Sequence, residues 1–223
     1  MNQKMSGAPL PASREPRAEI LRRIGEPEKT PEEILAEYSG ISREYNRAGS
    51  LGADGRLQML EDRLREYDAV VYRAHPQALP EIIAQILTGR GKARIAVPRG
   101  IPAEWLPAGF EFVLGEDSSA PELDAMDGVL SGCTVAIAAT GTLVLQNVPG
   151  QGARKLSLVP DYHLCIVASS QVVETVPEGF AALEQSKCSP TTLISGPSAT
   201  ADIEMTRIKG VHGPRFLDVV LIA

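Results

Sequence analysis

The sequence predicts an α/β fold in which helices flank a largely parallel sheet, preceded by a helical N-terminal extension. Short apolar runs of strand length, such as 94–97, alternate with segments of helical period, such as 80–89. Strand, helix and strand at this spacing are typical of parallel βαβ units. A glycine-rich break at 49–55 precedes this pattern. We therefore expect an arm with helices over 1–55 and an α/β domain over 56–223.

The N-terminal extension is predicted to contain two helices. Glu19 to Ile24 places apolar residues on one helical face. In the second helix Thr30 can act as N-cap, Pro31 suits the first position and Glu33 can complete a capping box. We expect that helix to run to about Tyr45.

The first half of the domain alternates helices and strands. Three leucines spaced three and four residues apart place one helix after residue 56. A second helix opens at Pro80 and ends at the glycines after Leu87. The predicted strands here are 68–72, 94–97 and 110–114, and a helical turn is expected at 104–106.

The second half is richer in strand. Val135–Ala138 and Leu143–Leu145 are joined by a Thr-Gly corner, which predicts a hairpin. Further apolar runs predict strands at 163–168, 192–195 and 216–222. A capped helix is expected from Thr175 to about Leu183, and another from Ser198 to about Ile208.

Composition excludes several functional classes. The formal net charge of −6 and pI of about 5.2 argue against a nucleic-acid footprint. No apolar run approaches the roughly 18–20 residues of a membrane span, and the N-terminus lacks a signal-peptide core, so we expect a cytoplasmic protein. The three cysteines form no iron–sulfur ligand run, and Cys133 and Cys165 are expected as reduced core residues. The histidine spacing predicts no metal site.

The first candidate site is the corner Thr140-Gly141-Thr142 with the loop 147–154. Glycines at a strand corner allow backbone N–H groups to face a ligand. Arg154 could neutralise an anion. The alternative is a tight hairpin beside a solvated basic loop.

The second candidate site begins where the strand 192–195 ends, at Ser195 and Gly196. A helix expected to start there would present its N-terminus to a phosphate or carboxylate, with hydroxyls from Ser195, Ser198 and Thr200. The alternative is ordinary helix capping, since Asp202 near the first turn also favours the helix dipole.

The third candidate is His212, which stands in Gly-Val-His-Gly and suits proton transfer. A loop histidine bonded to backbone is the alternative. His163 opens an apolar strand and is expected to be a structural histidine. We expect His212 and Asp202 as catalytic candidates, and Arg154, with Arg215, as anion contacts.

The two strand-end segments are expected to meet. Ligands of open α/β sheets lie beyond the carboxyl ends of the strands. We therefore predict the site where the Thr140–Thr142 corner meets the helix start at Ser195–Asp202.

Three runs of this chain resemble one family in their order and spacing: 127–142, 156–163, and 194–204 continuing to 210–215. They resemble the LUD family, in its small lactate-utilisation protein C branch, over about three-quarters of the chain. One departure is Ala139, where that family usually has Glu before Thr-Gly-Thr, so a carboxylate role does not carry over to this position.

The resemblance implies a Rossmann-like core similar to the ribose-phosphate isomerase, glucosamine-phosphate deaminase and CoA-transferase superfamily. It implies a part in oxidising lactate to pyruvate, alongside an iron–sulfur subunit and a second partner. Iron–sulfur clusters would belong to those partner subunits, with no cofactor bound by this chain.

Two other functions are compatible with the sequence. A stand-alone enzyme or binder for a phosphorylated or CoA-linked small molecule is suggested by the superfamily and by the expected helix start at Ser198. Fold analogy by itself is weak warrant for function. A non-catalytic scaffold or regulatory subunit is the third hypothesis.

Overall fold

The computed structural model describes residues 16–24, 29–184, 190–200, 208–209 and 212–223, and the chain divides into two units, 1–45 and 46–223. The first unit contains α1 (Pro16–Ile24) and α2 (Pro31–Gly40). The predicted capping box opens α2: Glu33 N donates to Thr30 Oγ1 at 3.2 Å, and Thr30 N donates to the Glu33 carboxylate at 2.7 Å. The helix ends at Gly40 and not near Tyr45, because glycine weakens a helix and Ile41 is already extended.

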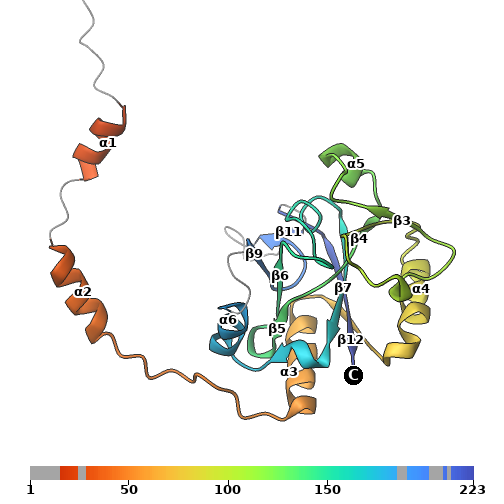
Figure 1. The fold of residues 1–223 in the computed structure, drawn as a ribbon, viewed down its shortest axis with the longest axis horizontal. Coiled ribbons are helices and arrows are strands. Elements are labelled where there is room, and N and C mark those ends of the chain that lie inside the picture. Colours follow the sequence, from red (N-terminus) through yellow and green to blue (C-terminus); the bar gives the residue numbers. More distant parts are fainter. Residues whose placement is uncertain (1–15, 25–28, 185–189, 201–207, 210–211) are drawn as a thin grey trace, which may run out of the picture. The chain divides into compact units, whose positions relative to one another are not determined.

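The second unit is built on a six-stranded sheet in which every neighbouring pair is parallel (Figure 1). This confirms the predicted α/β class with a parallel sheet and flanking helices. The last strand in sequence lies between the first strand and the middle of the sheet. In spatial order the strands are β1 (Val70–Ala74), β12 (Phe216–Ile222), β7 (Tyr162–Ala168), β4 (Gly128–Gly132), β2 (Arg94–Val97) and β3 (Glu111–Leu114).

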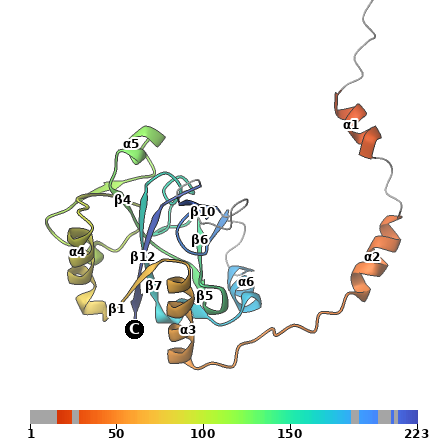
Figure 2. The same ribbon diagram turned by 180° about the vertical axis from the view of Figure 1, so that it is seen from behind.

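Helices α3 (Ala53–Glu66) and α4 (Leu79–Gly89) cover opposite faces of this sheet (Figure 2). Side chains alternate along a strand, so Leu164 of β7 packs with α4 while Cys165 packs with α3. The apolar residues of each helix recur at three- and four-residue spacing, which explains why each buries one face. The short 3-10 turn η1 (Pro76–Ala78) precedes α4, and a second one, η2 (Ala103–Trp105), follows β2.

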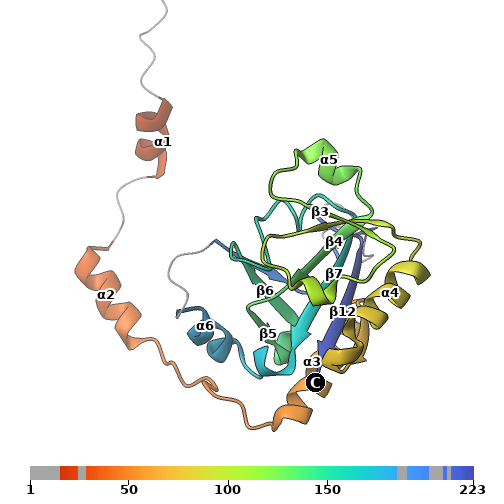
Figure 3. The same ribbon diagram turned by 45° about the vertical axis from the view of Figure 1, so that its right-hand side comes forward.

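A second, four-stranded sheet lies on the α3 side of the first (Figure 3). Its central pair is the predicted hairpin, confirmed by antiparallel pairing of Val135 with Val144. One face contributes to the core around α3, and the other packs against α6 (Val176–Glu184). The strands are β8 (Val172–Val173), β5 (Val135–Ile137), β6 (Thr142–Gln146) and β9 (Thr191–Ile194), accompanied by the turns η3 (Ala138–Thr140) and η4 (Ser169–Gln171). Helix α5 (Ala120–Asp124) belongs to the larger sheet, where Leu123 packs with Ala96 of β2 and Val129 of β4.

The segment just before α3, at the start of the second unit, is hydrogen-bonded to residues at the start of α6 and just before it. Gly49 N donates to the Glu178 carboxylate at 3.0 Å, and Leu51 N donates to Glu174 Oε2 at 2.6 Å. Glu178 also caps α6 by accepting from Thr175 N at 2.8 Å. These backbone bonds lower the pKa of Glu178, so its carboxylate stays charged where the segment before α3 meets the start of α6.

The predicted helix from Ser198 to Ile208 is wrong at both ends. Ala199–Thr200 forms β10 and Ile208–Lys209 forms β11, and the two pair antiparallel. Asp202 lies outside the described residues. Small polar residues before acids resemble a helix start, but the pairing of Ala199 with Lys209 decides the local conformation here. The helix N-terminus that motivated a phosphate site is therefore absent at Ser198.

Among the described parts of the chain, no helix is both long and apolar enough to cross a membrane. The two cysteines within them, Cys133 and Cys165, are buried and not disulfide-bonded, as predicted. Contact with the Cys165 thiol, together with burial, raises the pKa of the Cys133 thiol well above its usual value. The Cys133 thiol is therefore protonated at neutral pH.

Candidate functional site

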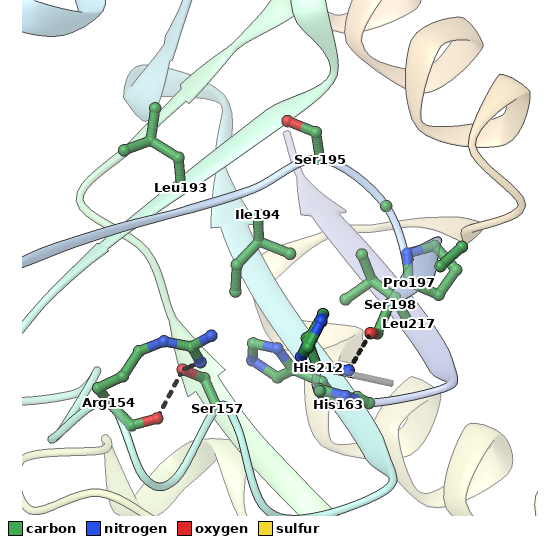
Figure 4. A pocket seen from close by; sticks show the side chains of 14 residues that line it. Arg154, Ser157, His163, Leu193, Ile194, Ser195, Pro197, Ser198, His212 and Leu217 are labelled. Atoms are coloured by element: carbon green, nitrogen blue, oxygen red, sulfur yellow. Dashed lines mark hydrogen bonds between the residues drawn. The ribbon is translucent and has the colours of Figure 1, made fainter. Parts of the chain in front are cut away.

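A cavity of about 230 Å³ lies where three loops meet beside the larger sheet (Figure 4). These loops, with the adjoining ends of β9 and β10, contribute Arg154 and Ser157, residues 193–199 and residues 212–214. His163 of β7 and Leu217 of β12 also line it, and these two residues are paired neighbours in the sheet. Segments distant in the sequence thus form one site.

This cavity lies at the amino ends of β7 and β12, since His163 and Leu217 are the second residues of their strands. The sequence-based expectation was a site beyond the carboxyl ends. The difference arises because the second sheet covers the α3 face, and the chain leaving β9 at Ile194 passes the amino ends of β7 and β12.

His163 is the most deeply buried polar residue of the cavity wall, with 1% of its surface exposed. Its Nε2 lies 2.8 Å from Ser131 Oγ on the neighbouring strand, whereas its buried Nδ1 has no hydrogen-bond partner in the described parts of the chain. Burial, together with the positive charge of Arg154, lowers the pKa of His163 to about 4. The imidazole is therefore neutral at pH 7.

Arg154 is the cationic residue of the cavity. Its Nη1 donates to Ser157 Oγ at 3.1 Å, and Ser157 donates back to the carbonyl of Arg154 at 3.3 Å. Within the described residues no carboxylate forms an ion pair with Arg154. Its neighbour Lys155 is engaged elsewhere, because Nζ donates to the backbone oxygens of Glu116 and Ser118.

His212 lines the cavity from an exposed loop. Its backbone N–H donates to Ser198 Oγ at 3.0 Å, and Ser198 N donates to Pro214 O at 2.8 Å. These two bonds join the chain after β9 to the chain before β12. Figure 4 shows Ser198 and His212 on the opposite side of the view from Arg154.

The Thr140–Thr142 corner meets the cavity through Ser195. Thr142 Oγ1 lies 2.8 Å from Ser195 Oγ and 2.7 Å from Thr140 Oγ1. Gly141 has φ of 60°, and a Cβ there would come within 2.9 Å of Arg63 Cβ on α3. Glycine is thus required for close packing on α3, and the corner supports Ser195 from behind.

We expect Thr142→Val to lower the free energy of unfolding by about 1 kcal/mol, because valine keeps the shape but removes both hydroxyl contacts. Urea denaturation measures this change. Thr140→Val is the matched control and should cost less, since it removes one contact at a half-buried position. A Thr142→Val protein as stable as the parent would contradict the supporting role.

The glycine loop 147–152 uses its amides internally. Gly150 N donates to Arg99 O at 2.6 Å, and Gly152 N donates to Val148 O at 3.0 Å. The loop is further held by Gln151, whose side-chain oxygen accepts from Gln146 N at 2.6 Å. The amides of Gly150 and Gly152 are therefore bonded within the protein, contrary to the expectation that backbone N–H groups of this candidate site face a ligand.

Arg215 lies outside the cavity wall. Its guanidinium forms two bonds to Asp161, of 2.6 and 2.7 Å, and this contact lowers the pKa of Asp161. Gly196 does line the cavity; its φ is 85°, and a Cβ there would lie 2.5 Å from Tyr67 Cβ. Thr200 is in β10, away from the lining.

Two polar side chains of the cavity were not predicted as site residues, His163 and Ser157. The only sequence signal for His163 was a polar residue at the start of a strongly apolar strand. Ser157 carried no signal, because its role depends on Arg154 folding back over it. Among the described residues, no group of three or more His, Cys, Asp or Glu is placed to hold a metal ion.

Comparison with known proteins gives a consistent result. A family model described as LUD domain matches residues 57–222. Lactate utilization protein C of Deinococcus radiodurans is 46% identical over 170 residues, covering 74% of this chain and 79% of that protein. Lactate utilization protein C of an Exiguobacterium species is 36% identical over 129 residues, covering 53% of this chain and 56% of that protein.

Among solved structures, the crystal structure of a DUF162 family protein from Deinococcus radiodurans is similar, with a TM-score of 0.68 and 39% identity. The match covers 78% of this chain and all of that chain. The matched part of this chain is about as long as the region from α3 to β12.

Proposed function

This chain belongs to the LUD domain family, and from that premise we propose that it is a component of a lactate-utilisation system, in which lactate is oxidised to pyruvate. The observation that carries the proposal is the 46% identity to a protein named Lactate utilization protein C over most of both chains. The cavity supports it, because the Arg154 guanidinium suits a small carboxylate.

We also propose that the electrons pass to iron–sulfur clusters on partner proteins, in the cytoplasm. A cluster is commonly held by four thiolates, and this chain has three cysteines. Two of them, Cys133 and Cys165, are buried with the Cys133 thiol pKa raised, so they do not fit as cluster ligands. The redox step then depends on subunits that this chain binds.

Complementation tests the proposal. In Deinococcus radiodurans deleted for the gene of its 46% identical relative, this chain should restore lactate consumption. The relative itself, reintroduced, is the positive control, and consumption of another carbon source is the control for general fitness. Soluble expression of this chain without any recovery, while the relative recovers fully, would reject the proposal. Iron and sulfide should co-purify with the tagged chain from lactate-grown cells.

A further inference from the structure

The cavity selects for a small ligand. Its volume of about 230 Å³ lies below the roughly 300–1,000 Å³ of sites for drug-sized ligands. The described lining contains no Asp or Glu, and it contains one permanent cation, Arg154. A small anion is therefore the chemistry that the charge of the wall favours.

The Arg154 guanidinium has further N–H groups that can donate to such an anion. Nη1 donates to Ser157 Oγ, and this bond holds the guanidinium at the wall. A carboxylate can accept two parallel N–H bonds from a guanidinium, which makes such a pair both strong and directional. The serine contact thus orients a cation whose charge is unpaired among the described residues.

His163 determines what the rest of the ligand must carry. The Ser131 hydroxyl can donate its one proton to the carbonyl of Gly132, which lies 3.1 Å from Oγ. In that arrangement Oγ accepts at its 2.8 Å contact with His163, and Nε2 carries the ring proton. Nδ1 is then a bare acceptor, buried and without a partner among the described residues.

A buried acceptor without a donor is costly, and a ligand that brings a donor relieves that cost. His163 lines the same cavity as Arg154, and the charge of Arg154 acts on its ring. The matching ligand has a negative group for Arg154 and a hydroxyl donor close to it for His163. A carboxylate with a hydroxyl on the adjacent carbon meets both requirements within the volume.

We propose that the cavity binds a 2-hydroxy carboxylate, with its carboxylate on Arg154 and its hydroxyl donating to Nδ1 of His163. This assignment rests on the proposed function, for which lactate is the simplest such molecule. It adds to that function where the ligand binds and which residue recognises the hydroxyl.

Calorimetric titration of the full chain with three matched probes tests the assignment. Lactate carries both groups, propionate lacks the hydroxyl and propane-1,2-diol lacks the carboxylate. We expect lactate to bind roughly tenfold tighter than propionate, and the diol to show no binding. Equal affinity for lactate and propionate, or no heat with lactate, would overturn the assignment.

Variants identify the residues. His163→Gln places an amide near the Nε2 position, so it can keep the Ser131 contact while removing Nδ1. It should abolish the preference for lactate over propionate and leave propionate binding unchanged. Arg154→Gln should weaken both acids by at least roughly tenfold. Arg94→Gln, which removes an exposed arginine paired with Glu111 far from the lining, is the matched control and should change neither.

A spectroscopic measurement on the parent protein is independent of any variant's folding. The ¹⁵N chemical shift of His163 Nδ1 should be that of an unprotonated ring nitrogen, and it should move when lactate, but not propionate, is added. A protonated Nδ1 in the free protein would overturn the assignment. Complementation without binding of a 2-hydroxy acid would reject this assignment alone, whereas binding without complementation would reject the proposed function alone.

Discussion

Replacing Asp218 with alanine should lower the free energy of unfolding by about 3 kcal/mol, because it removes one partner from a buried ion pair. Asp218 lies on β12, between β1 and β7 in the six-stranded sheet, and is fully buried. Arg90 binds its carboxylate through two guanidinium nitrogens, and Tyr162 donates to it at 3.0 Å. Alanine would leave the Arg90 charge and the buried Tyr162 hydroxyl without that acceptor.

Urea denaturation of Asp218→Ala measures this loss. An unchanged dependence of the free energy of unfolding on urea concentration would indicate that only the stability has changed. Asp117→Ala is the matched control. It removes the same chemical group from an exposed pair with Arg99, where the expected cost is below about 1 kcal/mol. Similar losses in the two variants would contradict the assigned role of the buried cluster.

The second large effect concerns pH. The free energy of unfolding should decrease by about 3 kcal/mol as the pH falls from 7 to 4, because His163 binds a proton more readily in the unfolded chain than in the folded protein. The ordinary pKa of histidine is about 6.5, and burial lowers it to about 4 in the folded protein. Between these values the unfolded state binds more protons, so stability rises with pH across that window.

Comparison with His163→Gln isolates this effect, since glutamine does not titrate. In the parent, the free energy of unfolding should change by roughly 1.4 kcal/mol per pH unit between pH 6.5 and 4. The variant should lack this dependence. Carboxylates with lowered pKa, such as Asp127 and Asp161, contribute in a lower window, below about pH 4. A parent and variant with parallel stability profiles would show that His163 is solvated or charged in the folded state.

The sequence predicts those elements whose pattern is local. The capping box at Thr30 and the hairpin around Gly141 both depend on neighbours a few residues apart, and both are present. The strand Gly128–Gly132 was not predicted from periodicity, because glycines at both of its ends interrupt the apolar run. A glycine at 128 is needed there, since a Cβ would lie 2.6 Å from the Tyr162 ring.

The cavity could not be predicted because its geometry comes from long-range pairing. Ser198 meets His212 only because the chain after β9 and the chain before β12 come together, and Ser131 meets His163 across two strands. Residue type did indicate Arg154 and Ser195 as site residues. No local signal distinguishes a histidine at a cavity wall from one wholly inside a core.

The position of β12 has a consequence for how the protein is made. Among the strands that the structure describes, β12 alone pairs with β1, and Val70 pairs with Asp218. While the ribosome is still producing the segments between them, β1 has no strand to join, and the half-built sheet exposes the edge of β7. Closing so long a loop is entropically costly and slow. In newly synthesised chains the edges of β1 and β7 therefore remain unpaired for an interval, and unpaired strand edges are prone to aggregation. Chaperones are expected to act on the chain during this interval.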